Sequence, residues 1–183
     1  MKKIMLIGDS IRMSYQEKVK QLLSGKADVW GPDDNCRFAK YTLNSCNAWF
    51  DAAGKPDIVH WNNGIWDVAR VSMTDREPLT SLDEYLKTLE RILCEWNVRN
   101  LTVVWANTTA VLPNHPRIEN ETLDSYNAAA AEFMSGKGIP ITDLNSVIKN
   151  NAAAYLIEDG VHLSAAGIDA CASEVVKSLE RFL

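Results

Sequence analysis

A serine near the N-terminus and an aspartate–histidine pair near the C-terminus have the side chains best suited to catalysis. The pair lies in the stretch "YLIEDGVHLSAAG", where Asp159 precedes His162 by three residues. A serine hydroxyl becomes a nucleophile when a neighbouring base takes its proton, and an imidazole oriented by a carboxylate suits that role. Ser10, in "LIGDSI", would thus supply the nucleophile, His162 the base and Asp159 the orienting group.

The other two histidines fit the role of base less well. His60 lies within a predicted strand, where packing is its expected role, and His115 lies in a loop. Each triad candidate also has a purely structural explanation, because a loop serine often forms a turn or cap and an Asp-x-x-His segment can form a turn. Their joint placement, after the first strand and before the last helix, favours the catalytic interpretation.

Short apolar runs alternate with longer amphipathic segments and predict the elements that position these residues. Strands are expected at 3–8, 27–31, 57–62, 101–107 and 141–145, and helices at 14–24, 42–53, 80–97, 120–135 and 164–182. Alternating strands and helices predict one α/β domain over residues 1–183, with a five-stranded parallel sheet covered on both faces.

Ligand sites in open α/β sheets lie beyond the carboxyl ends of the strands. Ser10 follows the first predicted strand, Asn62 and Asn63 follow the third, and residues 107–109 follow the fourth. We therefore expect these residues to meet on one rim of the sheet.

Composition argues against several classes of function. The net charge of −5 and the scattered basic residues provide no surface for nucleic acid. The four cysteines form no C-x-x-C pair, so we expect free thiols in a reducing compartment and no zinc or redox site. The N-terminal apolar run "IMLI" is too short for a signal peptide, and no stretch reaches the length of a membrane span. These features predict a soluble cytoplasmic protein.

In two sequence blocks that contain the candidate residues, the chain resembles the SGNH hydrolases, also called GDSL esterases/lipases. "IGDSI" resembles their first sequence block, and "DGVHLSAAG" resembles their last block and is the most specific signal in the sequence. The resemblance implies a flavodoxin-like three-layer α/β/α fold and a triad of Ser10, Asp159 and His162. The absence of a G-x-S-x-G motif counts against the larger α/β-hydrolase fold.

The two middle blocks depart from the family pattern. The family has a glycine after the second strand whose N–H joins the oxyanion hole; here Cys36 is the best match and Gly31 the alternative. The third block, usually Gly-x-Asn-Asp, reads "GIWD", so Trp66 replaces the asparagine. Of the two asparagines just upstream, we expect Asn63 to supply the missing donor, because it adjoins a glycine that can bend toward the site. The expected oxyanion hole therefore consists of Ser10, Cys36 and Asn63.

The resemblance implies hydrolysis of a small-molecule ester through an acyl-serine intermediate, without metal or organic cofactor. Trp61 and Trp66 flank the expected site, and aromatic faces suit sugar rings. No long apolar lid segment is present, so an acetyl ester on a carbohydrate is the expected substrate. An acyltransferase, a lysophospholipase or thioesterase of the same family, and a non-enzymatic flavodoxin-like module that binds a small ligand remain alternatives.

Overall fold

The apolar runs of the sequence form the strands of one sheet. A computed structural model describes all residues from 1 to 183. The strands lie in the order β2-β1-β3-β4-β5, and every neighbouring pair is parallel. Their bounds are β1 Lys2–Ile7, β2 Ala27–Trp30, β3 Ile58–Trp61, β4 Thr102–Ala106 and β5 Ile141–Thr142.

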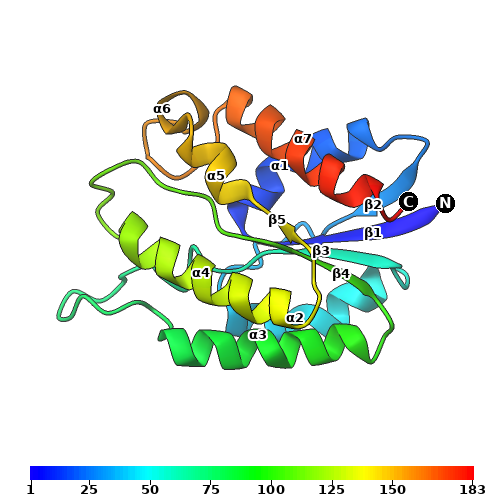
Figure 1. The fold of residues 1–183 in the computed structure, drawn as a ribbon, viewed down its shortest axis with the longest axis horizontal. Helices are drawn as coiled ribbons and strands as arrows, with labels where there is room; N and C mark the ends of the chain where they lie inside the picture. Colours follow the sequence, from blue (N-terminus) through cyan, green and yellow to red (C-terminus); the bar gives the residue numbers. More distant parts are fainter.

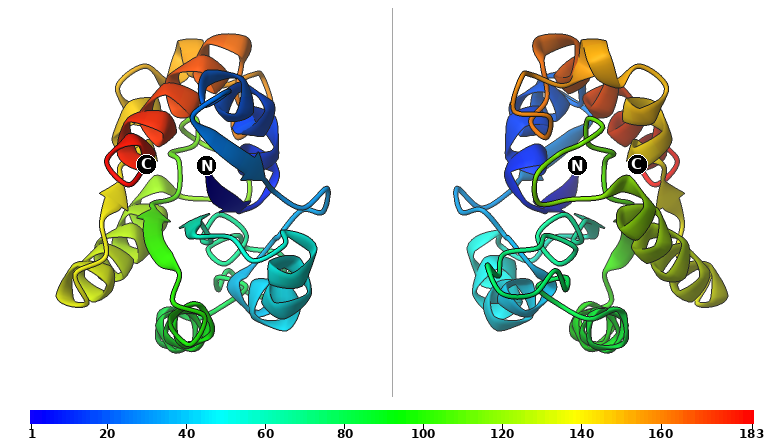
Figure 2. Two further views of the ribbon diagram at one scale, coloured as in Figure 1. Left: turned by 90° about the vertical axis from the view of Figure 1, so that its right-hand side faces the viewer. Right: turned by 90° about the vertical axis from the view of Figure 1, so that its left-hand side faces the viewer.

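Helices cover both faces of the sheet (Figures 1 and 2). Helices α1, α5 and α7 lie on one face, and α2, α3 and α4 lie on the other (Figure 2). Each face has its own cluster of buried apolar side chains. This arrangement confirms the predicted three-layer α/β/α fold with a five-stranded parallel sheet. The helix bounds are α1 Ser10–Leu22, α2 Ala39–Ala52, α3 Leu82–Asn97, α4 Asn120–Gly136, α5 Leu144–Lys149, α6 Ala152–Tyr155 and α7 Ala165–Glu180.

Two stretches differ from the predicted elements. The first helix begins at Ser10 rather than at residue 14, because the Asp9 side chain caps it there. The fifth strand ends at Thr142, since Asp143 caps a further helix directly after it. Helices α5 and α6 therefore occupy a segment for which no helix was predicted.

The carboxyl ends of the strands bring together segments that are distant in sequence. β1 and β3 are neighbours, with Ile7 opposite Trp61, so the turns that follow them start side by side. Both chain termini lie at the opposite end of the molecule (Figure 1). No helix combines the length and the apolar composition needed to span a membrane.

Candidate active site

Ser10 stands at the junction of β1 and α1. Oδ1 of Asp9, directly before it, accepts the N–H of Ile11 at 2.9 Å and caps the helix. As the first residue of α1, Ser10 has a backbone N–H without an intrahelical acceptor, at the positive end of the helix dipole. The junction therefore presents a hydroxyl and a backbone N–H donor together at the rim.

Asp159 and His162 belong to a tight turn, residues 159–162, which we call the triad turn. It is the tip of a short hairpin closed by an antiparallel bridge between Leu156 and Leu163. Gly160 within the turn has a φ of +77°, a conformation that glycine adopts most readily. Its carbonyl accepts the N–H of Leu112 at 2.8 Å, which anchors the turn to the loop after β4.

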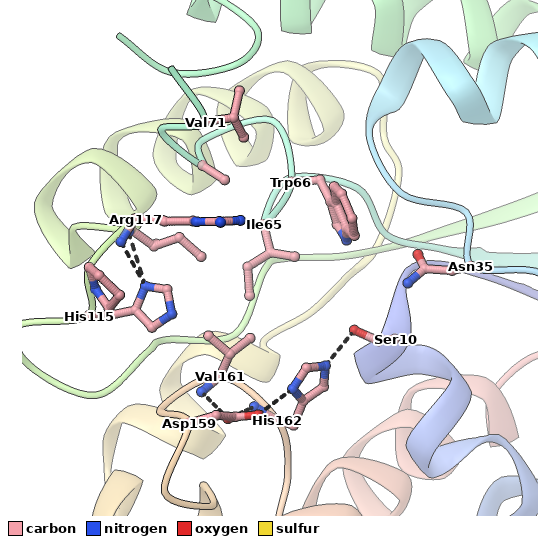
Figure 3. A pocket seen from close by; sticks show the side chains of 13 residues that line it. Ser10, Asn35, Ile65, Trp66, Val71, His115, Arg117, Asp159, Val161 and His162 are labelled. Carbon is pink, nitrogen blue, oxygen red and sulfur yellow. Dashed lines mark hydrogen bonds and ion pairs between the residues drawn. The ribbon is translucent and has the colours of Figure 1, made fainter. Parts of the chain in front are cut away.

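The three triad candidates are brought into contact (Figure 3). Oγ of Ser10 lies 3.0 Å from Nε2 of His162, and Nδ1 of His162 lies 2.7 Å from Oδ2 of Asp159. The other oxygen of Asp159 accepts the backbone N–H groups of Val161 and His162, each at 2.9 Å. When Nδ1–H donates to the carboxylate, Nε2 of the neutral imidazole is free to accept the serine proton.

The charge of Asp159 suits this arrangement. Partial burial acts to raise its pKa, but the N–H groups of Val161 and His162 and the imidazole outweigh this effect and lower the pKa to about 2. A carboxylate that stays ionised can fix the imidazole tautomer and stabilise the imidazolium formed during the reaction.

The loop between β2 and α2 is held by a buried arginine that was not predicted from the sequence. Arg12 on α1 is 1% exposed, and its guanidinium donates to the carbonyls of Pro32 (2.8 Å) and Asp34 (2.7 Å). Cys36 follows in the same loop, and its backbone N–H donates to the Gly8 carbonyl at 3.2 Å. The N–H expected to join the oxyanion hole is thus already engaged within the chain.

Asn63 lies in a second turn, residues 62–67, which we call the asparagine turn. Its side chain is fully buried: Nδ2 donates to Oγ1 of Thr42 (3.0 Å) and to the Arg37 carbonyl (3.1 Å). Its Oδ1 accepts the indole N–H of Trp61 at 2.7 Å. The expectation that Asn63 donates to the oxyanion does not fit these contacts, because both amide hydrogens already have acceptors.

The rest of the asparagine turn is fixed just as firmly. The Asn62 amide donates to the last carbonyl of β4 at 2.8 Å. Gly64 has a φ of +148°, and a Cβ there would lie 2.2 Å from Oγ1 of Thr108. The buried carboxylate of Asp67 accepts the N–H of Ala39 at the start of α2 (3.1 Å), and burial raises the pKa of Asp67 to about 7. This turn therefore joins elements of the core.

Two further residues of β3 lie in the core. Trp61, expected to flank the site, packs edge-on against Trp105 with ring centroids 4.8 Å apart and is fully buried. His60 is buried as predicted, with Nε2 3.1 Å from Oγ1 of Thr142, and burial lowers its pKa to about 3. Neither residue can contact a ligand beside Ser10.

An open cavity of about 420 Å³ lies beside Ser10 and His162 (Figure 3). This volume suits a small organic molecule. No group of three or more His, Cys, Asp or Glu side chains is placed to hold a metal ion. The lining residues are Ser10, Asn35, Ile65, Trp66, Ala69, Val71, His115, Pro116, Arg117, Ile118, Asp159, Val161 and His162.

Two side-chain donors on the cavity wall, in Asn35 and Trp66, have no hydrogen-bond partner in the chain. Oδ1 of Asn35 accepts the N–H of Arg37 at 2.9 Å, which leaves the Nδ2 end of the amide on the side nearer Ser10 (Figure 3). The indole of Trp66 is 37% exposed, and its nitrogen edge is directed toward the same space (Figure 3). Gly31, the alternative to Cys36, does not line the cavity.

These two donors could have been suspected from the sequence. Asn35 directly precedes Cys36, and Trp66 occupies the position at which the SGNH hydrolases carry their asparagine. The single N–H of Trp66 lies far out on a large ring, unlike the amide of an asparagine. In the structure the large ring extends from the asparagine turn into the cavity, with its nitrogen edge directed toward the space beside Ser10.

No model of a known family and no curated protein sequence matches the chain. Solved structures resemble it closely in fold. An acetyl xylan esterase has a TM-score of 0.82 and 17% identity, covering 97% of this chain and 99% of its own. A lipase/acylhydrolase from Enterococcus faecalis has a TM-score of 0.83 and 19% identity, and the alignment covers 99% of this chain and 96% of that protein. A GDSL-like lipase from Bacteroides thetaiotaomicron has a TM-score of 0.80 and 16% identity, and the alignment covers 100% of this chain and 89% of that protein. Over nearly its whole length, the chain shares the three-layer fold of these hydrolases.

Proposed function

We propose that the protein is a serine esterase of the SGNH hydrolase family that hydrolyses a small acyl ester. The observation that carries this proposal is the unbroken chain of contacts from Ser10 through His162 to Asp159 at the edge of an open cavity. A non-enzymatic ligand-binding module has no need for this geometry. The fold shared with an acetyl xylan esterase and with GDSL-like lipases supports the same conclusion.

The contacts support a two-step mechanism. His162 Nε2 accepts the proton of Ser10 as Oγ attacks the ester carbonyl, and Asp159 stabilises the resulting imidazolium. The imidazolium then protonates the leaving alcohol, and an acyl-serine remains. Water attacks this intermediate with His162 again as the base, which releases the acid and restores the serine.

Charge that develops on the carbonyl oxygen requires fixed donors beside Ser10. The N–H of Ser10 is the first, because it begins α1 and lacks an intrahelical acceptor. We assign the other two positions to Nδ2 of Asn35 and Nε1 of Trp66, which face the cavity without partners. They replace Cys36 and Asn63, whose donors are engaged inside the fold.

The proposed substrate is an acetyl ester, with a carbohydrate as one class of alcohol, in keeping with the acetyl xylan esterase of the same fold. Only Trp66 of the two tryptophans predicted at the site can contact a sugar, because Trp61 is buried. Cytoplasmic localisation stays a prediction from the sequence.

Labelling with an organophosphonate probe tests the role of Ser10. Mass spectrometry should locate one adduct on the peptide that contains Ser10, and prior alkylation of the thiols should not prevent it. Ser10→Ala should lose the label and reduce kcat for 4-nitrophenyl acetate by about 10⁴-fold or more while it keeps the wild-type circular dichroism spectrum. A label on another residue would show that the triad assignment is wrong.

A further inference from the structure

Arg117 is a charged residue of the cavity wall that has no function in the mechanism above. Its backbone is fixed from two sides: its N–H lies 3.3 Å from Nδ1 of His115, and its carbonyl accepts the Arg70 N–H at 2.9 Å. Its guanidinium makes no hydrogen bond or ion pair in the chain and extends along the cavity toward Ile65 (Figure 3). A fixed backbone thus presents a free cation to the cavity.

Two acidic groups, one on the cavity wall and one close to Arg117 in the sequence, are already engaged. The triad carboxylate, Asp159, receives the N–H groups of the triad turn and the His162 imidazole. Glu119, two residues along the chain from Arg117, pairs with Arg70 and Arg76. The guanidinium of Arg117 is therefore a positive charge on the cavity wall that no carboxylate of the chain neutralises.

His115 provides a second donor at the same end of the cavity. Its Nδ1 accepts the N–H groups of Arg117 (3.3 Å) and Ile118 (3.1 Å), so the ring proton of the neutral imidazole lies on Nε2. Burial lowers the pKa of His115, which favours this neutral form. Nε2 has no partner in the chain, so it can donate to a ligand beside the guanidinium.

The position of this pair relative to the triad decides which part of an ester it would meet. His162 protonates the leaving alcohol, so the alcohol lies on the His162 side of the carbonyl. Asn35 and Trp66 border Ser10 at one end of the cavity, whereas Arg117 and His115 lie at the other end, beyond Val161 (Figure 3). Ile65, Val71, Val161 and Ile118 are apolar residues that line the same cavity.

Building on the proposed esterase function, we propose that Arg117, assisted by His115, binds an anionic group on the alcohol part of the substrate. A guanidinium pairs with a carboxylate or a phosphate through charge-assisted hydrogen bonds. The site would accordingly take acyl esters of acidic alcohols, such as acetylated uronic acids or acetylated phosphosugars, in preference to their neutral counterparts.

Matched aryl acetates test this preference. 3-Acetoxybenzoate and 3-acetoxybenzamide have the same shape and differ in the charge of one group, and 3-acetoxyphenyl phosphate provides the phosphate arm. We expect the wild-type enzyme to have about tenfold higher kcat/KM for an anionic acetate than for the amide, mainly through KM. The preference should shrink as salt is added, because the attraction is electrostatic.

Arg117→Gln should remove this preference and leave kcat/KM for the neutral amide within about twofold of wild type. Arg117→Lys, which keeps the charge, should restore part of it. Arg91→Gln, an exposed arginine on α3 outside the cavity, is the matched control and should behave like wild type. Equal kcat/KM for charged and neutral acetates in the wild type, or a preference that survives in Arg117→Gln, would overturn the inference while the esterase proposal stands.

Binding to the Ser10→Ala variant tests the same idea without turnover. We expect 3-hydroxybenzoate to shift the amide resonances of His115, Arg117 and Ile118 more strongly than 3-hydroxybenzamide, and Arg117→Gln on this background should abolish the difference. Equal binding, or no binding of either compound, contradicts the anionic site. If no ester is cleaved by the wild type and the binding difference persists, the proposed esterase function fails and the anionic site remains.

Discussion

The triad turn and the asparagine turn border the same cavity, yet they shift the pKa values of their carboxylates in opposite directions. Asp159 is half-exposed, and backbone and imidazole donors lower its pKa to about 2 although partial burial opposes them. Asp67 is buried, and burial raises its pKa to about 7 although it accepts the Ala39 N–H. One carboxylate is kept ionised beside the reacting groups, and the other is held within the fold.

The two turns also differ in the range of their contacts. The carboxylate of Asp159 contacts residues two and three positions away. The triad turn meets distant parts of the chain through two bonds, from His162 to Ser10 and from the Leu112 N–H to the Gly160 carbonyl. Asn63 and Gly64 meet residues that are more than 20 positions away, in α2, α3 and the loop after β4. We therefore expect substitutions in the triad turn to affect chemistry, and those of the buried residues Asn63 and Asp67 in the asparagine turn to affect stability.

Among substitutions in the two turns, the largest effect is expected for Asp159→Asn. The amide keeps an oxygen for the backbone N–H groups but presents an NH₂ to Nδ1 of His162, which favours the wrong imidazole tautomer. We predict that kcat for 4-nitrophenyl acetate falls by about 10³–10⁴-fold while the melting temperature changes little. An activity within tenfold of wild type would show that Asp159 does not orient the base.

Trp66→Phe and Asn35→Ala test the reassigned oxyanion donors. Each removes one donor that faces the cavity, and we predict a fall in kcat of about 10²–10³-fold with little change in KM, since the contact forms in the transition state. Unchanged kcat in both variants would leave the Ser10 N–H as the one assigned donor and exclude these two.

Asn63→Ala separates the two interpretations of the asparagine turn. Truncation leaves the buried indole N–H of Trp61 without its acceptor and removes donors to Thr42 and Arg37. We predict a loss of about 2–3 kcal/mol in the free energy of unfolding, measured by urea denaturation. The kcat of the folded fraction should stay within a few-fold of wild type. A large fall in kcat at unchanged stability would instead support the original oxyanion assignment.

Contacts between residues close in the sequence could be predicted, whereas the contacts that Cys36 and Asn63 make with distant parts of the chain could not. The contact between Asp159 and His162 could be predicted because both residues lie within one four-residue turn. The positions of Cys36 and Asn63 could not, because they depend on where each donor finds an acceptor elsewhere in the chain. Asn63 was expected at the site because it adjoins a glycine, whereas both Asn62 and Asn63 are engaged inside the fold.

The smallest effect concerns pH and Asp67. Because the folded-state pKa of Asp67, about 7, lies above its ordinary value of 3.8, the folded state binds this proton more tightly than the unfolded state. The resulting stabilisation is complete at low pH and is lost as pH rises toward 7. Asn at this position carries no charge at any pH and can still accept the Ala39 N–H.

Asp67→Asn should therefore flatten the fall in stability between pH 5 and pH 8 by on the order of 1–2 kcal/mol, as followed by thermal unfolding in matched buffers. Some fall should remain, because burial also raises the pKa of Asp9, to about 6, and its effect has the same sign. Asp143→Asn is the control: hydrogen bonds from Asn107 and Ser146 lower the pKa of Asp143 despite its burial, so it is ionised in both states throughout this range. If Asp67→Asn and Asp143→Asn change the pH profile equally, the buried carboxylate of the asparagine turn is not the group that titrates.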